Sequence, residues 1–216
     1  MDGTLVSSTS LAHEASNAVL QKFGFRTISR EEYGQGTKFT TPVRLAWHAG
    51  IKDDDKAQAM GDAFDSSIID LVTADNVPMF QGMRQLIDGL LKLDIKIAIL
   101  SNASGGYVRR VAQKHGMSSM FRIQWGADDA LRPKPHPDGL LSILERLKVD
   151  PKASRTVYIG DSVSDGKAAR SAGMTSVGVG WGENKKEVLM DSGAFDIVFS
   201  QVSQLDQFLL AAHRNK

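Results

Sequence analysis

From residue 77 onward, short apolar segments alternate with helical ones, and this alternation restricts the fold more than any other feature of the chain. We expect strands at 95–100, 121–125, 156–159, 175–179 and 195–199, with a helical pattern between each strand and the next. Strands and helices that alternate at this spacing form a parallel sheet with helices on both faces. In such folds the functional residues lie at the carboxyl ends of the strands.

The preceding segment, from about residue 10 to residue 75, has an almost wholly helical pattern. Apolar residues recur at three- and four-residue spacing until Gly24, which ends the first helix. Pro42 stands at the first turn of a further helix. The sequence therefore predicts an α/β core built from residues 1–9 and 79–216, with an all-helical insert at 10–78.

Composition narrows the class of protein and its partners. The chain has 216 residues, a formal net charge of +1 and no cysteine. This charge balance gives no reason to expect nucleic acid or a membrane surface as a partner, and the lack of cysteine removes disulfides and cysteine nucleophiles together. The N-terminus carries neither a basic leader nor an apolar signal core. We expect a cytoplasmic monomer or homodimer, although a natural N-terminus further upstream would leave a targeting peptide open.

Polar residues stand where the fold would place a site: one segment opens the chain, one lies between prolines, and two directly follow the predicted strands 95–100 and 156–159. In chain order they are Asp2-Gly3-Thr4, Ser101-Asn102, Lys134, Asp161 and Asp165. A carboxylate at a strand end beside a glycine turn suits a hard cation such as Mg²⁺, which prefers oxygen ligands. A hydroxyl and an ammonium group nearby can hold the oxygens of a phosphate and offset its charge.

Each of these residues also has an ordinary structural interpretation. Ser101 could cap the helix that begins near residue 105, and Lys134 could be a solvated loop lysine. Asp161 and Asp165 could be a helix cap and a first-turn acid. The occurrence of all of them in this order is far more specific than any one alone.

Four motifs together resemble those of one known superfamily. They are Asp2-Gly3-Thr4-Leu5, Leu100-Ser101-Asn102, Lys134-Pro135-His136-Pro137, and Ile159-Gly160-Asp161-Ser162 with Asp165. Over essentially its whole length the chain resembles the haloacid dehalogenase superfamily hydrolases, in the subgroup of phosphoglycolate phosphatases and β-phosphoglucomutases. The resemblance implies a Rossmann-like core with a helical cap at 10–78. It also implies Mg²⁺-dependent hydrolysis of a small phosphorylated metabolite, such as phosphoglycolate, through an aspartyl-phosphate.

The same resemblance implies a role for each matching residue. Asp2 would be the general acid and base, and its backbone carbonyl would bind the metal. Ser101 and the Asn102 region would bind the transferring phosphoryl group, and Lys134 would neutralise its charge. Asp161 would bind Mg²⁺ directly, while Asp165 would assist through water.

The superfamily's nucleophile is an aspartate two positions before Asp2, so it would directly precede Met1. The 216 residues contain no match for it, and we expect the chain as given to have little phosphatase activity. The first core strand, which the family places between strands 95–100 and 156–159, would be missing with it. A shortened N-terminus is the favoured explanation. The alternative is a non-catalytic homologue that still binds Mg²⁺ or phosphate, with the Met1 amino group near the empty nucleophile position.

The cap is expected to decide the substrate, because it closes over the leaving group. Lys38 and Arg44 are the candidate substrate-binding residues of the insert. Phosphonate-cleaving relatives use a cap lysine to form a Schiff base, so Lys38 keeps a phosphonatase open as an alternative. A phosphomutase is a further alternative, whereas dehalogenation is disfavoured because dehalogenases lack the second acid that Asp2 provides.

Overall fold

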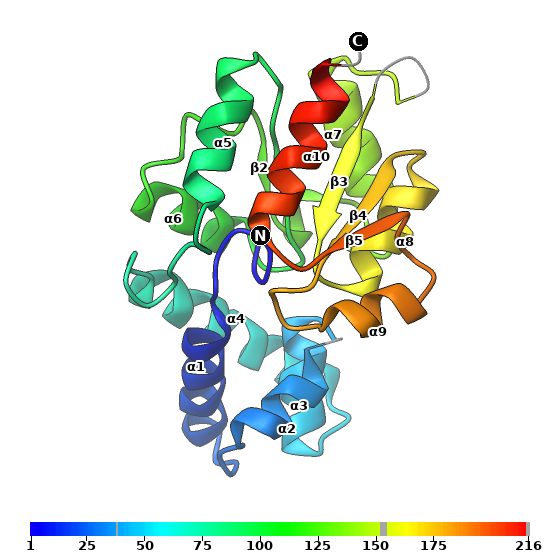
Figure 1. Cartoon of the computed structure of the whole chain (residues 1–216). Helices are drawn as coiled ribbons and strands as arrows, with labels where there is room; N and C mark the ends of the chain where they lie inside the picture. The colour runs from blue at the N-terminus through cyan, green and yellow to red at the C-terminus, as the bar shows by residue number, and fades with distance from the viewer. Residues whose placement is uncertain (38, 152–154, 215–216) are drawn as a thin grey trace.

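The computed structural model describes residues 1–37, 39–151 and 155–214. Its five short strands are all parallel and form two sheets (Figure 1). The first sheet pairs β1 (Ile99–Leu100) with β2 (Gln124–Trp125), and the second joins β3 (Val157–Gly160), β4 (Thr175–Val179) and β5 (Ile197–Phe199). The predicted α/β class with parallel strands is confirmed.

The strands lie where they were expected: β4 has the expected bounds, β3 is shifted by one residue, and β1, β2 and β5 are shorter than expected. Hydrogen bonds of the β1–β2 ladder continue beyond the regular pairs, from Arg122 N to Ile97 O at 2.9 Å and from Ser101 N to Trp125 O at 3.0 Å. In the described part of the chain no backbone ladder joins the two sheets. A side-chain hydrogen bond connects them, since the Tyr158 hydroxyl of β3 donates to the Leu100 carbonyl of β1 at 2.8 Å. Among the described residues, β2 is the one strand that pairs with β1.

Helices cover both faces of the sheets, as the alternation predicts. They are α5 (Met83–Lys92), α6 (Gly105–Lys114), α7 (Asp138–Leu147), α8 (Val163–Ser171), α9 (Lys186–Asp191) and α10 (Val202–Arg214), with a short 3-10 turn at Ala127–Asp129. Adjacent residues of β1 face opposite layers, because side chains alternate along a strand. Ile99 packs in the apolar cluster that includes α5, α6 and α10, whereas Leu100 packs with residues of α7 and α8.

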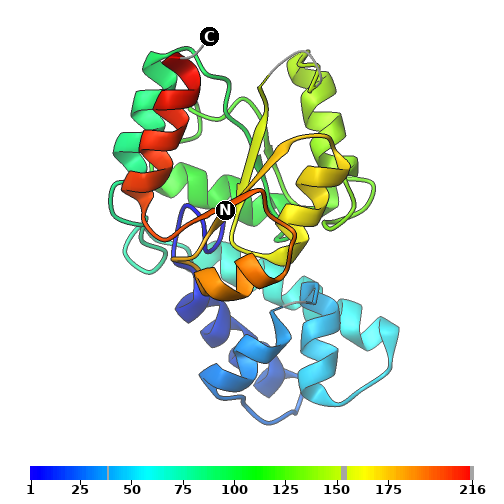
Figure 2. The same ribbon diagram turned by 45° about the vertical axis from the view of Figure 1, so that its right-hand side comes forward.

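Four helices form a separate group below the sheets in Figure 1, and the turned view of Figure 2 shows the same separation. They are α1 (Thr9–Lys22), α2 (Arg30–Gly36), α3 (Thr41–Ala49) and α4 (Asp54–Leu71). Local signals set their ends: Ser29 and Glu32 form a capping box at α2, Pro42 lies in the first turn of α3, and Asp53 caps α4. Among the helices described, none combines the length and apolar character needed to cross a membrane.

This helical group meets the α/β part where α4 packs on the first turn of α6. A Cβ at Gly106 would lie 2.9 Å from Ile69 Cδ1, so the end of the Ile69 side chain packs directly on the backbone of α6. One turn away on α4 lies Asp65, whose burial and, after that, the charge of Asp128 raise its pKa to about 6. An acidic group at this seam is thus disfavoured in its charged form.

Replacing this acid should change how stability depends on pH. The folded-state pKa of Asp65 lies above the unfolded value of about 4, so the native state loses stability as pH rises from about 4 to 6. At pH 7 we expect Asp65→Asn to raise the free energy of unfolding by roughly 1 to 3 kcal/mol and to flatten this decline. Urea denaturation at pH 4.5 and 7.5 measures it, with Asp70→Asn, an exposed acid on the same helix, as control. Equal pH dependence in wild type and Asp65→Asn would contradict the prediction.

Candidate active site

Loops that follow different strands converge on the N-terminal turn. The Ser101 hydroxyl, just after β1, donates to Asp2 Oδ2 at 3.4 Å, and the Thr4 hydroxyl donates to Asp161 Oδ1, just after β3, at 3.4 Å. Lys134 reaches the end of β1, where Nζ donates to the Leu100 carbonyl at 3.2 Å. The structure therefore brings together the residues that the four sequence motifs single out.

The cluster contains a buried ion pair between Lys134 and Asp165. Lys134 Nζ lies 2.8 Å from Asp165 Oδ1, and each of the two side chains is only 7% exposed. The other donors of the ammonium group go to Tyr158 Oη at 2.9 Å and to the Leu100 carbonyl. Burial lowers the pKa of Lys134, but Asp165 and Tyr158 outweigh it, so the pKa is raised and the lysine stays charged. Lys134 is thus not the solvated loop lysine of the ordinary interpretation.

Asp165 also has a structural duty. Its Oδ2 accepts a hydrogen bond from Ser162 N at 2.9 Å, which closes a capping box at the start of α8. The Asp165 carboxylate packs directly on the backbone of Gly160, where a Cβ would lie 2.3 Å from it. Asp165 is therefore both the first-turn acid of α8 and the ion-pair partner of Lys134.

Asp161 lies in a cradle that two glycines keep open. A Cβ at Gly3, whose φ is +65°, would lie 1.9 Å from Asp161 Oδ2, and one at Gly182 would lie 2.5 Å from the same oxygen. The carboxyl group is 7% exposed, and burial, followed by the charge of Asp165, raises its pKa to about 7. A buried carboxylate beside a second carboxylate favours a positively charged ligand.

The donors around Asp161 fit a small cation that prefers oxygen. In residues 1–37, 39–151 and 155–214, no three acidic or histidine side chains are arranged to hold a metal ion. Mg²⁺ does not need such a cage, because it commonly takes one or two carboxylates together with waters and substrate phosphate oxygens. Asp161, next to the backbone of the N-terminal turn, is the residue that could hold it.

The carboxylate of Asp2 is held by three hydroxyl groups, two of which the sequence did not indicate. Ser8 Oγ and Tyr107 Oη donate to Oδ1 at 2.6 Å and 3.1 Å, and Ser101 donates to Oδ2. Tyr107 is buried on α6. No motif or spacing identifies Ser8 or Tyr107, since their contribution depends on how α1 and α6 are rotated toward the N-terminal turn.

The side chains of Ser101 and Asn102 bind different partners. Ser104, not Ser101, is the residue before α6, so Ser101 does not cap that helix. Ser101 Oγ instead accepts from Ala103 N at 3.1 Å while it donates to Asp2. The Asn102 amide makes a pair of hydrogen bonds with the backbone of Lys134, at 2.9 Å and 3.0 Å. Asn102 therefore holds the lysine loop in place.

The sequence indicates two candidate substrate-binding residues in the insert, Lys38 and Arg44. Lys38 lies outside the described residues. Arg44 is 8% exposed, and its guanidinium carbon lies 5.1 Å and 5.3 Å from the ring centroids of Tyr33 and Phe64. Arg44 Nε is buried without a hydrogen-bond partner among the described residues.

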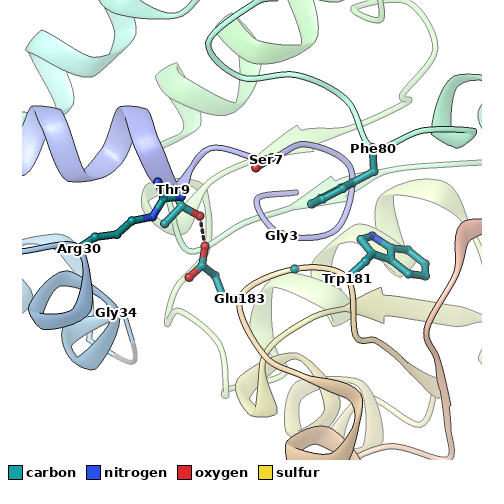
Figure 3. Close-up of a pocket in the computed structure, with 9 residues that line it drawn as sticks. Gly3, Ser7, Thr9, Arg30, Gly34, Phe80, Trp181 and Glu183 are labelled. Atoms are coloured by element: carbon teal, nitrogen blue, oxygen red, sulfur yellow. Dashed lines mark hydrogen bonds between the residues drawn. The ribbon is translucent and has the colours of Figure 1, made fainter.

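A cavity of about 320 Å³ opens beside Gly3, between the α/β part and the helical group (Figure 3). Its walls come from the N-terminal turn, from the start of α1 and α2, and from the loop after β4. The residues labelled on its two sides include Thr9, Arg30, Phe80, Trp181 and Glu183. Its volume is that of a small-molecule site.

The cradle around Asp161 leads to a test with a matched control. Gly3→Ala should lower the free energy of unfolding by roughly 2 to 4 kcal/mol, because it combines a strained left-handed conformation with a collision against Asp161. Gly24→Ala shares a positive φ of +81° but has open space around it, so it should cost only the backbone part. Urea denaturation of both variants separates the two effects, and equal losses would argue against the cradle.

A parallel α/β core with acidic, hydroxyl and ammonium groups at its strand ends is a Rossmann-like fold with a polar site that suits phosphate chemistry. The family sequence model of the haloacid dehalogenase-like hydrolases matches residues 1–179. The chain therefore belongs to that family.

The similar proteins include phosphoglycolate phosphatases from several bacteria. The phosphoglycolate phosphatase of Pectobacterium atrosepticum is 29% identical over 194 residues, which are 88% of this chain and 81% of that protein. The phosphoglycolate phosphatase of Escherichia coli is 27% identical over 134 residues, which are 62% of this chain and only 52% of that protein. The chain thus spans about half the length of the latter relative. The chain is thus similar to phosphoglycolate phosphatases within the family.

Solved structures support the fold. A Bacteroides fragilis protein assigned as a haloacid dehalogenase-like hydrolase superposes with a TM-score of 0.84 at 26% identity, covering 95% of this chain and 96% of that one. A family hydrolase from Entamoeba histolytica has a TM-score of 0.81 at 18% identity, with 96% and 95% covered. The second likeness concerns the fold alone.

Proposed function

We propose that the protein is a Mg²⁺-dependent phosphatase for a small phosphate monoester, with phosphoglycolate as the reference substrate. The observation that carries the proposal is the buried Lys134–Asp165 ion pair at 2.8 Å, placed beside Ser101, Asp2 and the open cradle of Asp161. A charged lysine fixed at the end of β1 can offset the negative charge of a transferring phosphoryl group. The similarity to two phosphoglycolate phosphatases supports the choice of substrate class.

In this proposal each side chain has one task. Ser101 and the neighbouring backbone bind the phosphoryl oxygens, and Lys134 stabilises the charge on them. Asp2 gives a proton to the leaving oxygen and then takes one from the attacking water. Asp161 and the Asp2 carbonyl would hold Mg²⁺, whose charge would help to neutralise the phosphate oxygens.

Two finer points complete the proposal. The nucleophile is an aspartate directly before Met1, so the 216 residues alone are expected not to turn over substrate. Residues 10–78 act as the cap, with Lys38 and Arg44 as the candidate contacts to the leaving group. The closed position of the cap excludes water from the site.

Phosphate release tests the proposal. The chain is extended upstream by about six apolar residues that end in Asp, and phosphate release from phosphoglycolate is followed with Mg²⁺ and with EDTA. We expect turnover of about 1 to 1,000 per second with Mg²⁺, none with EDTA, and none from the 216-residue chain. An extended, folded chain that releases no phosphate from any of a panel of monoesters would overturn the proposal.

A further inference from the structure

The loop between β4 and α9 contacts parts of the site that are far apart in sequence. The indole Nε1 of Trp181 donates to the Thr4 carbonyl at 3.1 Å, and the amide of Asn184 donates to the Asp161 carbonyl at 2.9 Å. Between them, Gly182 lies so close to the N-terminal turn that a Cβ there would be 2.2 Å from the Gly3 carbonyl oxygen. We call residues 181–184 the connector loop.

One residue of the connector loop contacts both the metal cradle and the start of the helical group. The backbone N–H of Glu183 donates to Asp161 Oδ2 at 3.1 Å. Its carboxylate accepts a hydrogen bond from Thr9 Oγ1, and Thr9 is the first residue of α1. Figure 3 shows Thr9 and Glu183 joined in this way, with Arg30 of α2 beside them.

The surroundings of Glu183 make its carboxylate responsive to the helical group. Arg30 makes no ion pair in the part of the chain that the structure describes, and its charge acts on Glu183. A shift of α1 and α2 would move Thr9 and Arg30 away from the Glu183 side chain. The connector loop would then lose its hydrogen bond to the helical group. Because the backbone N–H of Glu183 also binds Asp161, the position of the Asp161 carboxylate would be less fixed.

We propose that Glu183 is a positioning residue through which the helical group, α1 to α4, sets the affinity of Asp161 for a divalent cation. The inference rests on the proposed role of Asp161 in the phosphatase. In the arrangement seen here, the Thr9–Glu183 hydrogen bond keeps the connector loop against the N-terminal turn and fixes Asp161 Oδ2. Residues that orient a metal ligand typically change metal affinity by about 10- to 100-fold when they are removed.

A binding experiment tests this without using turnover. Mn²⁺, which accepts the same oxygen ligands as Mg²⁺, is titrated into the full chain, and free Mn²⁺ is followed by electron paramagnetic resonance. Glu183→Ala and Thr9→Val should each weaken binding by about tenfold. The double variant should be no weaker than either single one, because both remove the same tie. Glu183→Gln, which still accepts from Thr9, should bind nearly as wild type.

Two reference variants separate the possible failures. Glu187→Ala removes an exposed acid in the first turn of α9, just after the connector loop, and should leave Mn²⁺ affinity unchanged. Asp161→Asn should abolish specific binding. If Asp161→Asn abolishes binding while Glu183→Ala binds as wild type, or if Glu183→Ala and Thr9→Val are additive, the coupling is refuted and the phosphatase proposal stands. If wild type and Asp161→Asn bind Mn²⁺ equally, both proposals fail.

Discussion

Replacing Asp2 by asparagine should lower kcat for phosphate release by about 100- to 10,000-fold in the chain that carries the upstream aspartate. An amide cannot give or take the proton that the leaving oxygen and the water require. The hydrogen bonds from Ser8, Tyr107 and Ser101 keep the side chain in place, so KM should change little. The loss should therefore appear in kcat.

Steady-state kinetics on purified variants measure this effect. Asp75→Asn, which neutralises an exposed acid in a turn, is the control and should retain wild-type kcat. Ser8→Ala removes one of the hydrogen bonds that orient Asp2 and should give a smaller loss than Asp2→Asn. A kcat for Asp2→Asn equal to that of wild type would show that Asp2 is not the acid and base.

The second large effect concerns stability. Lys134→Met should lower the free energy of unfolding by about 3 to 5 kcal/mol, since it leaves the Asp165 charge buried without its partner. Methionine keeps the length of the side chain, so little of the loss comes from packing. The Leu100 carbonyl and Tyr158 hydroxyl lose a donor as well, which adds to the penalty.

Two comparisons sharpen this prediction, both by urea denaturation. Arg132→Met breaks the surface pair with Asp138, in which the arginine side chain is 55% exposed, and should cost no more than about 1 kcal/mol. Lys134→Met combined with Asp165→Asn should recover most of the loss, because no unpaired charge remains and the amide oxygen still accepts from Ser162 N. A single Lys134→Met loss as small as that of Arg132→Met would show that the ion pair is not the buried element described here.

The core fold and the gathering of site residues could be predicted because both follow from regular patterns. Parallel strands place their carboxyl ends at one edge, so motifs that follow separate strands had to meet there. Ser101, after β1, and Asp161, after β3, both reach the N-terminal turn in this way. The helices of the insert were predictable for a similar local reason, since capping residues and apolar spacing mark their ends.

Side-chain direction and loop packing could not be predicted. Arg44 stands between exposed Val43 and buried Leu45, and only the rotation of α3 decides that it points between Tyr33 and Phe64. Tyr107 reaches Asp2 for a similar reason on α6. The contacts of Glu183 depend on tertiary packing of a loop that carries no periodic signal. Asn102, expected at the phosphoryl group, spends its amide on the Lys134 backbone.

The central claim is that the cluster of Asp2, Ser101, Lys134, Asp161 and Asp165 is a phosphoryl-transfer site that needs one more carboxylate. Two extended chains that differ only in the residue directly before Met1, Asp in one and Asn in the other, test it by the rate of phosphate release from phosphoglycolate with Mg²⁺. We predict turnover with Asp and a rate at background with Asn. Equal rates from the two chains would contradict the account.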